Sequence, residues 1–119
     1  MKYLCLIYQN EQNAERNTSE QGNTMLQEYF DFTEDIRKSG HMLGGEALQP
    51  TSAATTVRVR NGKVSTTDGP FIETKEQLGG FYLIEGKDLN DAIQVASRIP
   101  GAKTGAIEVR PIRVFSNSM

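Results

Sequence analysis

The clearest local pattern in this chain is the run TTVRVRNGKVSTTD at residues 55–68, in which two alternating segments flank Asn61 and Gly62. Both central residues of a type I′ turn need a positive φ, which Asn and Gly adopt at little cost. The run therefore predicts a β-hairpin of two strands, residues 55–60 and 63–67, joined by a two-residue turn. An antiparallel sheet is the starting point for the fold.

The turn also sets which residues face each other across the hairpin. Counting back from it pairs Val59 with Val64, and Thr55 with Asp68. One face then carries Val57, Val59 and Val64, and the other carries Arg58, Arg60 and Lys63. Asp68 is expected on the valine face, where a carboxylate must be hydrogen-bonded, paired with a cation or raised in pKa.

Hydrophobic periodicity outside the hairpin predicts two helices and four further strands. The strands are expected at residues 3–8, 42–48, 80–85 and 105–114. One helix is expected to begin between residues 19 and 24 and to end at Gly40. The other follows its cap, Asp88, and stops at Pro100. The predicted buried stripes are Met25, Tyr29, Phe32 and Ile36, widened by Leu26 and Phe30, in the first helix, and Leu89, Ala92, Ile93, Ala96 and Ile99 in the second.

This order predicts an α+β fold of ferredoxin-like type, with both helices on one face of a mostly antiparallel sheet. The strands at 3–8 and 80–85 are apolar on both sides, so the face that the helices leave open also needs a cover. The simplest cover is a second copy of the chain related by a two-fold axis. We therefore expect a homodimer in which two sheets enclose a cavity.

Composition limits the classes of function. A chain of 119 residues forms one domain, and its net charge of −2 gives no electrostatic reason for nucleic acid or an anionic membrane as a partner. The first apolar run is too short to span a bilayer, and a single cysteine is typical of a reducing compartment. We expect a cytoplasmic protein with neither a membrane nor a nucleic-acid partner.

Motifs for cofactors are absent from the sequence. It has no paired His/Cys spacing for zinc, no glycine-rich loop for a dinucleotide or triphosphate, and no nucleophile elbow. We therefore expect no cofactor and no metal. A metal held only by the carboxylates of Glu46, Asp68 and Glu73 is the remaining alternative.

The run after the hairpin, DGPFIETKEQLGG at residues 68–80, resembles the signature of the DGPF proteins, a branch of the YCII-related family. Similar residues extend along nearly the whole chain, so the resemblance is specific. They lie at residues 2–8, 45–48, 56–58, 67–80, 98–101 and 108–111.

The resemblance implies a dimeric α+β barrel in a bacterial protein, in agreement with the burial argument. Similar proteins often occur near, or fused to, extracytoplasmic-function sigma factors. One YCII-like enzyme removes hydrogen chloride from a chlorinated aromatic, and a histidine–aspartate pair has been proposed as the active site. That histidine lies early in the first helix region, where this chain has none, so the pair is not carried over.

Asp68 and Glu46 are the candidate catalytic residues. Asp68 suits a general acid or base at the mouth of the barrel; the alternative is an aspartate that only caps its own turn. Glu46 follows a glycine pair in a strand, a place where backbones approach closely. Pointing inward, it would be a second carboxylate for acid–base chemistry; pointing outward, it would have no such role.

The candidate substrate-binding residues are Glu73, Lys75, Arg110, Tyr8 and Phe71. Charged side chains of this kind hold a polar substrate or form exposed ion pairs, and aromatic side chains line a pocket or only pack. His41 follows the first helix and is expected to complement its last carbonyls, and Cys5 is expected in the core.

From these residues and the resemblance we expect a cofactor-free small-molecule enzyme. It would catalyse an elimination, isomerisation or proton transfer on an aromatic or carbonyl-bearing substrate in the dimer-enclosed cavity. The alternative is a non-catalytic small-ligand-binding or regulatory module associated with sigma-factor signalling. The two differ in whether the bound molecule is converted.

Overall fold

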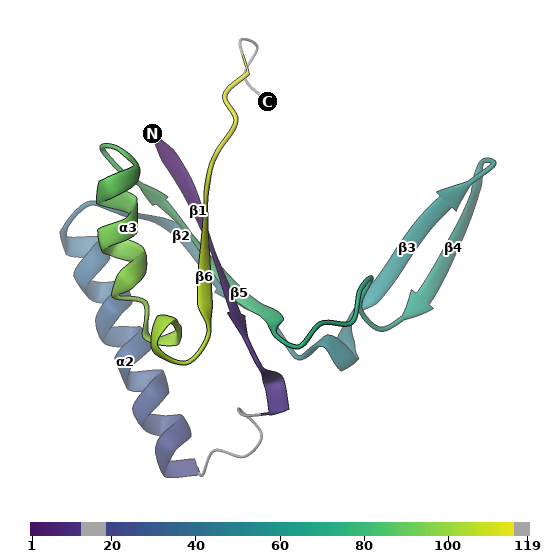
Figure 1. Ribbon diagram of the computed structural model, residues 1–119, viewed down its shortest axis with the longest axis horizontal. Helices are drawn as coiled ribbons and strands as arrows, with labels where there is room; N and C mark the ends of the chain where they lie inside the picture. Colours follow the sequence, from purple (N-terminus) through teal and green to yellow (C-terminus); the bar gives the residue numbers. More distant parts are fainter. Residues whose placement is uncertain (13–18, 116–119) are drawn as a thin grey trace.

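A four-stranded sheet, a separate two-stranded hairpin and two α-helices make up the computed structural model, which describes residues 1–12 and 19–115 (Figure 1). The strands are β1 (Lys2–Gln9), β2 (Met42–Ala47), β3 (Thr55–Arg60), β4 (Lys63–Asp68), β5 (Gln77–Glu85) and β6 (Ala106–Pro111). The helices are α2 (Ser19–Lys38) and α3 (Leu89–Ser97), with short 3-10 turns η1 (Thr51–Ala53) and η2 (Pro100–Lys103). The predicted strands and helices are confirmed, although β5 begins three residues earlier than expected.

The main sheet has the strand order β2-β5-β1-β6, and every neighbouring pair is antiparallel. Its two central strands, β1 and β5, are the segments that the sequence shows to be apolar on both sides. Both helices cover the same face of this sheet (Figure 1). The ferredoxin-like α+β arrangement is confirmed. No helix in the described part of the chain is long and apolar enough to cross a membrane.

The core lies between the helices and the sheet. Its largest fully buried side chains are Tyr3, Cys5, Ile36, Ile84, Val95 and Ile99. Part of each predicted helical stripe is wrong, because Leu89, Ile93, Leu26 and Phe30 are about half exposed or more. In α3 the buried row is instead Ala92, Val95 and Ala96, which has the i, i+3, i+4 spacing of one helix face, and the buried Ile99 follows just after the helix. Ile93 is one residue past Ala92, about 100° around the helix, and lies beside that row.

The predicted helix boundaries have the expected local chemistry. Asp88 caps α3, and its Oδ1 accepts a 2.8 Å hydrogen bond from the backbone N–H of Asp91. After α2, Gly40 has a φ of 83°, a conformation that glycine adopts without strain, and the N–H of His41 bonds the carbonyl of Ile36. These caps fix where each helix meets the sheet.

The hairpin has the predicted turn and register but not the predicted surroundings. Asn61 and Gly62 have φ values of 51° and 73°, and Val59 pairs with Val64 and Thr55 with Asp68. However, β3 and β4 form their own two-stranded sheet, which projects from the body (Figure 1). We call this hairpin, residues 55–68, the arm. All of β4 is exposed. Within a single chain, the expectation that Asp68 lies in apolar surroundings is therefore wrong.

Candidate functional site

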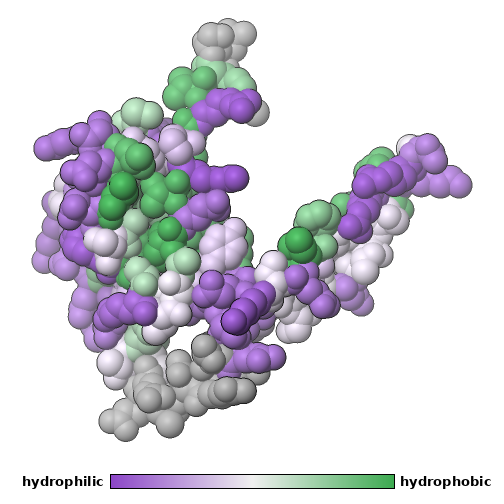
Figure 2. Space-filling view, in the orientation of Figure 1, coloured by the Kyte–Doolittle hydropathy of each residue, from purple (hydrophilic) through white to green (hydrophobic). Residues whose placement is uncertain are grey.

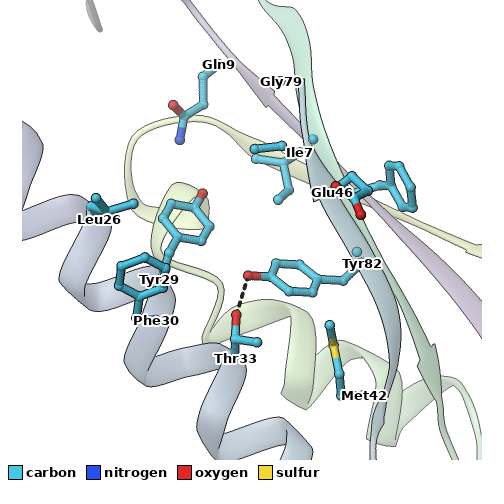
Figure 3. Close-up of a pocket in the computed structure, with 14 residues that line it drawn as sticks. Ile7, Gln9, Leu26, Tyr29, Phe30, Thr33, Met42, Glu46, Gly79 and Tyr82 are labelled. Atoms are coloured by element: carbon cyan, nitrogen blue, oxygen red, sulfur yellow. Dashed lines mark hydrogen bonds between the residues drawn. The ribbon is translucent and has the colours of Figure 1, made fainter. Parts of the chain in front are cut away.

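A cavity of about 400 Å³ lies between α2 and the strands β2 and β5 (Figure 3). Its lining is mainly apolar and aromatic, and its volume is in the range of small-molecule sites. The residues that line it are Ile7, Gln9, Leu26, Tyr29, Phe30, Thr33, Met42, Gly45, Glu46, Ala47, Gly79, Gly80, Phe81 and Tyr82.

Glycines in the two strands allow this cavity to form beside the ring of Tyr82. A Cβ atom on Gly45 would lie 2.9 Å from the Phe81 carbonyl oxygen and 2.9 Å from Cδ1 of Tyr82. A Cβ atom on Gly80 would lie 2.9 Å from the Glu46 carbonyl oxygen. The expectation that the glycine pair of β2 marks a close approach of backbones is therefore confirmed at Gly45.

The polar groups of the cavity are hydroxyls and one amide. The hydroxyls of Tyr82 and Thr33 are 2.8 Å apart and hydrogen-bonded, and Figure 3 shows Tyr82 reaching from β5 toward α2 to make this contact. The Tyr29 hydroxyl accepts a 3.1 Å hydrogen bond from the Gly101 N–H, so its own proton can be donated to a ligand. Gln9 approaches from β1 (Figure 3).

Tyr29 remains a protonated donor at neutral pH. Burial raises its pKa above the ordinary value of 10.0, while the hydrogen bond from Gly101 acts in the opposite direction. A neutral phenol in a mostly apolar cavity is suited to donating a hydrogen bond to a carbonyl or phenolic oxygen.

Three of the predicted site residues lie on the sheet face that the helices leave uncovered, which we call the open sheet face. Side chains alternate along a strand, and the buried Tyr3, Cys5 and Ile7 point to the helices. The open sheet face therefore carries the half-buried residues Leu4, Leu6, Tyr8, Phe81 and Leu83, with Glu46 and Arg110 beside them.

Glu46 points away from the cavity that it borders. It pairs with Phe81, the neighbour of the inward-facing Tyr82, so its exposed side chain projects from the open sheet face. In a single chain this side chain is exposed, on the face over which the predicted homodimer would enclose its cavity. Arg110 lies 3.7 Å from the carboxylate of Glu108, an exposed ion pair that contributes little to stability.

The other predicted site residues belong to the arm and to the loop that follows it. Asp68 ends β4, and Gly69 returns the chain to the arm base through a hydrogen bond from its N–H to the Ala54 carbonyl. The ring of Phe71 is 73% exposed, with the Arg58 guanidinium 5.5 Å from its centroid. Glu73 and Lys75 are exposed. The predicted residues thus form two groups in one chain, one on the open sheet face and one along the arm.

His41 makes a contact that sequence reasoning missed. Its Nε2 lies 3.2 Å from both carboxylate oxygens of Asp91, and its Nδ1 lies 2.7 Å from the Ser39 hydroxyl. The expectation that it complements the carbonyls of α2 is therefore wrong for its side chain, which connects the end of α2 to the first turn of α3. The backbone N–H of Lys87 also bonds Asp91 and is the main cause of the lowered pKa of that carboxyl.

The remaining candidates for metal and thiol chemistry can be placed as well. Among residues 1–12 and 19–115, no three His, Cys, Asp or Glu side chains gather closely enough to hold a metal ion, and Glu46, Asp68 and Glu73 form no such group. Cys5 is fully buried, as predicted, and burial raises the pKa of its thiol to about 11.

The cavity itself was not anticipated, although the sequence contained a signal for it. Leu26, Tyr29, Phe30 and Thr33 have the i, i+3, i+4, i+7 spacing of one helix face. This face lies beside the buried row of Phe32 and Ile36, and a second apolar row next to a core stripe indicates a second contact. Its outer members are exposed because they border a cavity.

Comparison with known proteins places these features in a family. The YCII-related domain family matches residues 1–116. An uncharacterized protein of Rhizobium meliloti is 34% identical over 117 residues, which cover 97% of this chain and 94% of that protein. The chain belongs to the YCII-related family.

Proposed function

We propose that this protein binds a small, largely apolar molecule in the cavity between α2 and β5. The observation that carries the proposal is an apolar cavity of about 400 Å³ with hydroxyl groups on one wall. Sites with mainly apolar lining and a few convergent polar groups are typical of small-molecule recognition. If the protein is an enzyme, an acid–base reaction of the bound molecule would follow this binding step.

The hydroxyl groups indicate the chemistry of the ligand. Tyr29 can donate its proton, and the hydrogen-bonded pair of Thr33 and Tyr82 has one further proton to donate. A ligand with a carbonyl or phenolic oxygen would pair with these donors while its ring or alkyl part displaces water from Ile7, Leu26 and Met42. An aromatic ketone or phenol is the class that fits both requirements.

We keep catalysis by Asp68 and Glu46 as a proposal, but the reaction site would lie outside this cavity. The carboxylate of Glu46 projects from the open sheet face, and Asp68 lies on the arm. If the protein is an enzyme using these groups, its reacting atoms lie on the open sheet face. The homodimer that we propose would enclose that face.

A panel of small phenols, aromatic ketones and aromatic acids, followed by NMR chemical-shift mapping, tests the binding proposal. We expect shifts at Tyr29, Thr33 and Tyr82 for the oxygen-bearing aromatics. Leu26→Trp, which fills the cavity, should abolish these shifts. Its matched control is Gln27→Trp, on the same helix but outside the cavity lining, which should retain them. Shifts that survive Leu26→Trp, or no shifts at millimolar ligand, would contradict the proposal.

The same samples separate an enzyme from a binding protein. One-dimensional spectra recorded over a day show whether the ligand is converted. Conversion that is lost in Glu46→Gln supports acid–base catalysis by that residue. Binding without conversion supports the non-catalytic alternative.

A further inference from the structure

The arm carries apolar side chains that no described part of its own chain covers. Val57, Val59 and Val64 share one face and are 56–69% exposed, and Phe71 and Ile72 beside the arm base are also exposed. Figure 2 shows hydrophobic side chains along the arm on the side that faces the hollow between arm and body. An isolated two-stranded hairpin is marginally stable in water, so the arm needs a surface to pack against.

The shape of the chain indicates the size of that surface. The radius of gyration is 16.4 Å, whereas a compact domain of this length has about 13.5 Å. The accessible surface is 8842 Å², against about 6,400 Å² for a compact monomer of the same mass. The excess of about 2,400 Å² per chain is the amount that each partner buries in a large obligate homodimer interface.

Charge is also complementary between the arm and the rest of the molecule. The arm contains three cations, Arg58, Arg60 and Lys63, and one carboxylate, Asp68, which gives it a net charge of +2. Since the chain as a whole has a net charge of −2, the residues outside the arm carry −4. An arm brought close to the body of a second copy is therefore attracted to it, which favours a copy of this chain as the partner.

We propose that the arm of each copy packs its valine face against the open sheet face of a second copy, across a two-fold axis. The open sheet face offers Leu4, Leu6, Phe81 and Leu83 as the apolar surface. The hollow between arm and body receives the partner, and the partner's arm lies on this chain's own sheet. The inference rests on the homodimer put forward above and adds to it the element that holds the two copies together.

Two neighbouring arm residues with side chains on opposite faces provide the test. Val64→Asp places a carboxylate on the valine face, and Ser65→Asp places the same charge on the cationic face. Sedimentation velocity should show wild type and Ser65→Asp at twice the chain mass of 13.2 kDa. In Val64→Asp the dimer dissociation constant should rise by at least ~100-fold, because a carboxylate would be buried at two symmetry-related sites. Circular dichroism checks that each variant is folded.

A photo-crosslinking side chain at Val59 identifies the surface that the arm contacts. In a mixture of ¹⁴N- and ¹⁵N-labelled chains, we expect crosslinks between chains, onto β1 or β5. Crosslinks within one chain, or onto α2 or α3, would overturn the proposal. A monomeric wild type would overturn both the dimer and the arm contact. A dimer that persists unchanged in Val64→Asp would overturn the arm contact alone, and neither result bears on ligand binding in the cavity.

Discussion

Two adjacent glycines in β2 should respond very differently to the same added methyl group. Gly45→Ala adds a Cβ atom 2.9 Å from the Phe81 carbonyl oxygen and 2.9 Å from Cδ1 of Tyr82. Carbon atoms in contact are normally ~3.5–4.0 Å apart, so either the two strands separate or the Tyr82 ring moves. At Gly44 an added Cβ atom meets nothing within 4 Å among the residues that the structure describes.

The expected cost of Gly45→Ala follows from this contact. Overpacking of a well-packed site costs about 1–3 kcal/mol, and one contact here is to backbone, which cannot rotate away. We expect a value in the upper half of that range. Gly44→Ala should raise the free energy of unfolding by about 0.4–1 kcal/mol, because alanine loses less backbone entropy than glycine on folding and fits without strain.

Urea unfolding followed by circular dichroism measures both variants, and ¹H–¹³C spectra of the tyrosine rings report the position of Tyr82. We expect a lower midpoint for Gly45→Ala at an unchanged denaturant slope, together with shifted Tyr82 resonances. Equal stability of the two variants, or an undisturbed Tyr82 ring in Gly45→Ala, would show that glycine is not needed for the close approach of β2 and β5.

Three further results are expected. A double-mutant cycle of Tyr82→Phe and Thr33→Val, measured by urea unfolding, should give a coupling of about 1 kcal/mol for their 2.8 Å hydrogen bond; additive effects would refute it. Asp91→Asn should destabilise the protein at pH 7. The lowered pKa of Asp91 provides stability that is fully present above its ordinary value of 3.8 and is lost as the pH falls through the folded value, so variant and wild type should converge in acid unfolding curves. Cys5, with a pKa of about 11, should react with iodoacetamide at pH 8 about 100-fold more slowly in folded than in unfolded protein; equal rates would contradict its burial.

Local features of the fold could be predicted from the sequence because they depend on neighbouring residues. The Asn61–Gly62 turn determines the register of the hairpin within a few residues of itself, and Asp88 determines the start of α3 through one hydrogen bond. Strands β1 and β5 are apolar on both sides, which places them in the centre of the sheet. These patterns, with the resemblance of residues 68–80, were sufficient for the fold class and the family.

The candidate site was less accessible to sequence reasoning because it is assembled from distant segments. Tyr29 and Thr33 come from α2, Tyr82 from β5 and Gln9 from β1, and no local pattern shows that these side chains meet. Charged residues attract attention in a sequence, yet Glu46 points away from the cavity and Asp68 lies on an exposed strand. The contact between His41 and Asp91 likewise joins residues that are 50 positions apart.

The sequence by itself determined the strands, the helices, their caps and the hairpin register, because each of these depends on the periodicity or turn chemistry of a short segment. Only the tertiary structure decided that the hairpin stands apart from the sheet. The alternation in Val57, Val59 and Val64 specifies a face, but whether that face is covered depends on where the chain turns at Pro50 and Gly69. The cavity also depends on the tertiary structure. It exists where glycines of the paired strands β2 and β5 leave space beside Tyr82 of β5.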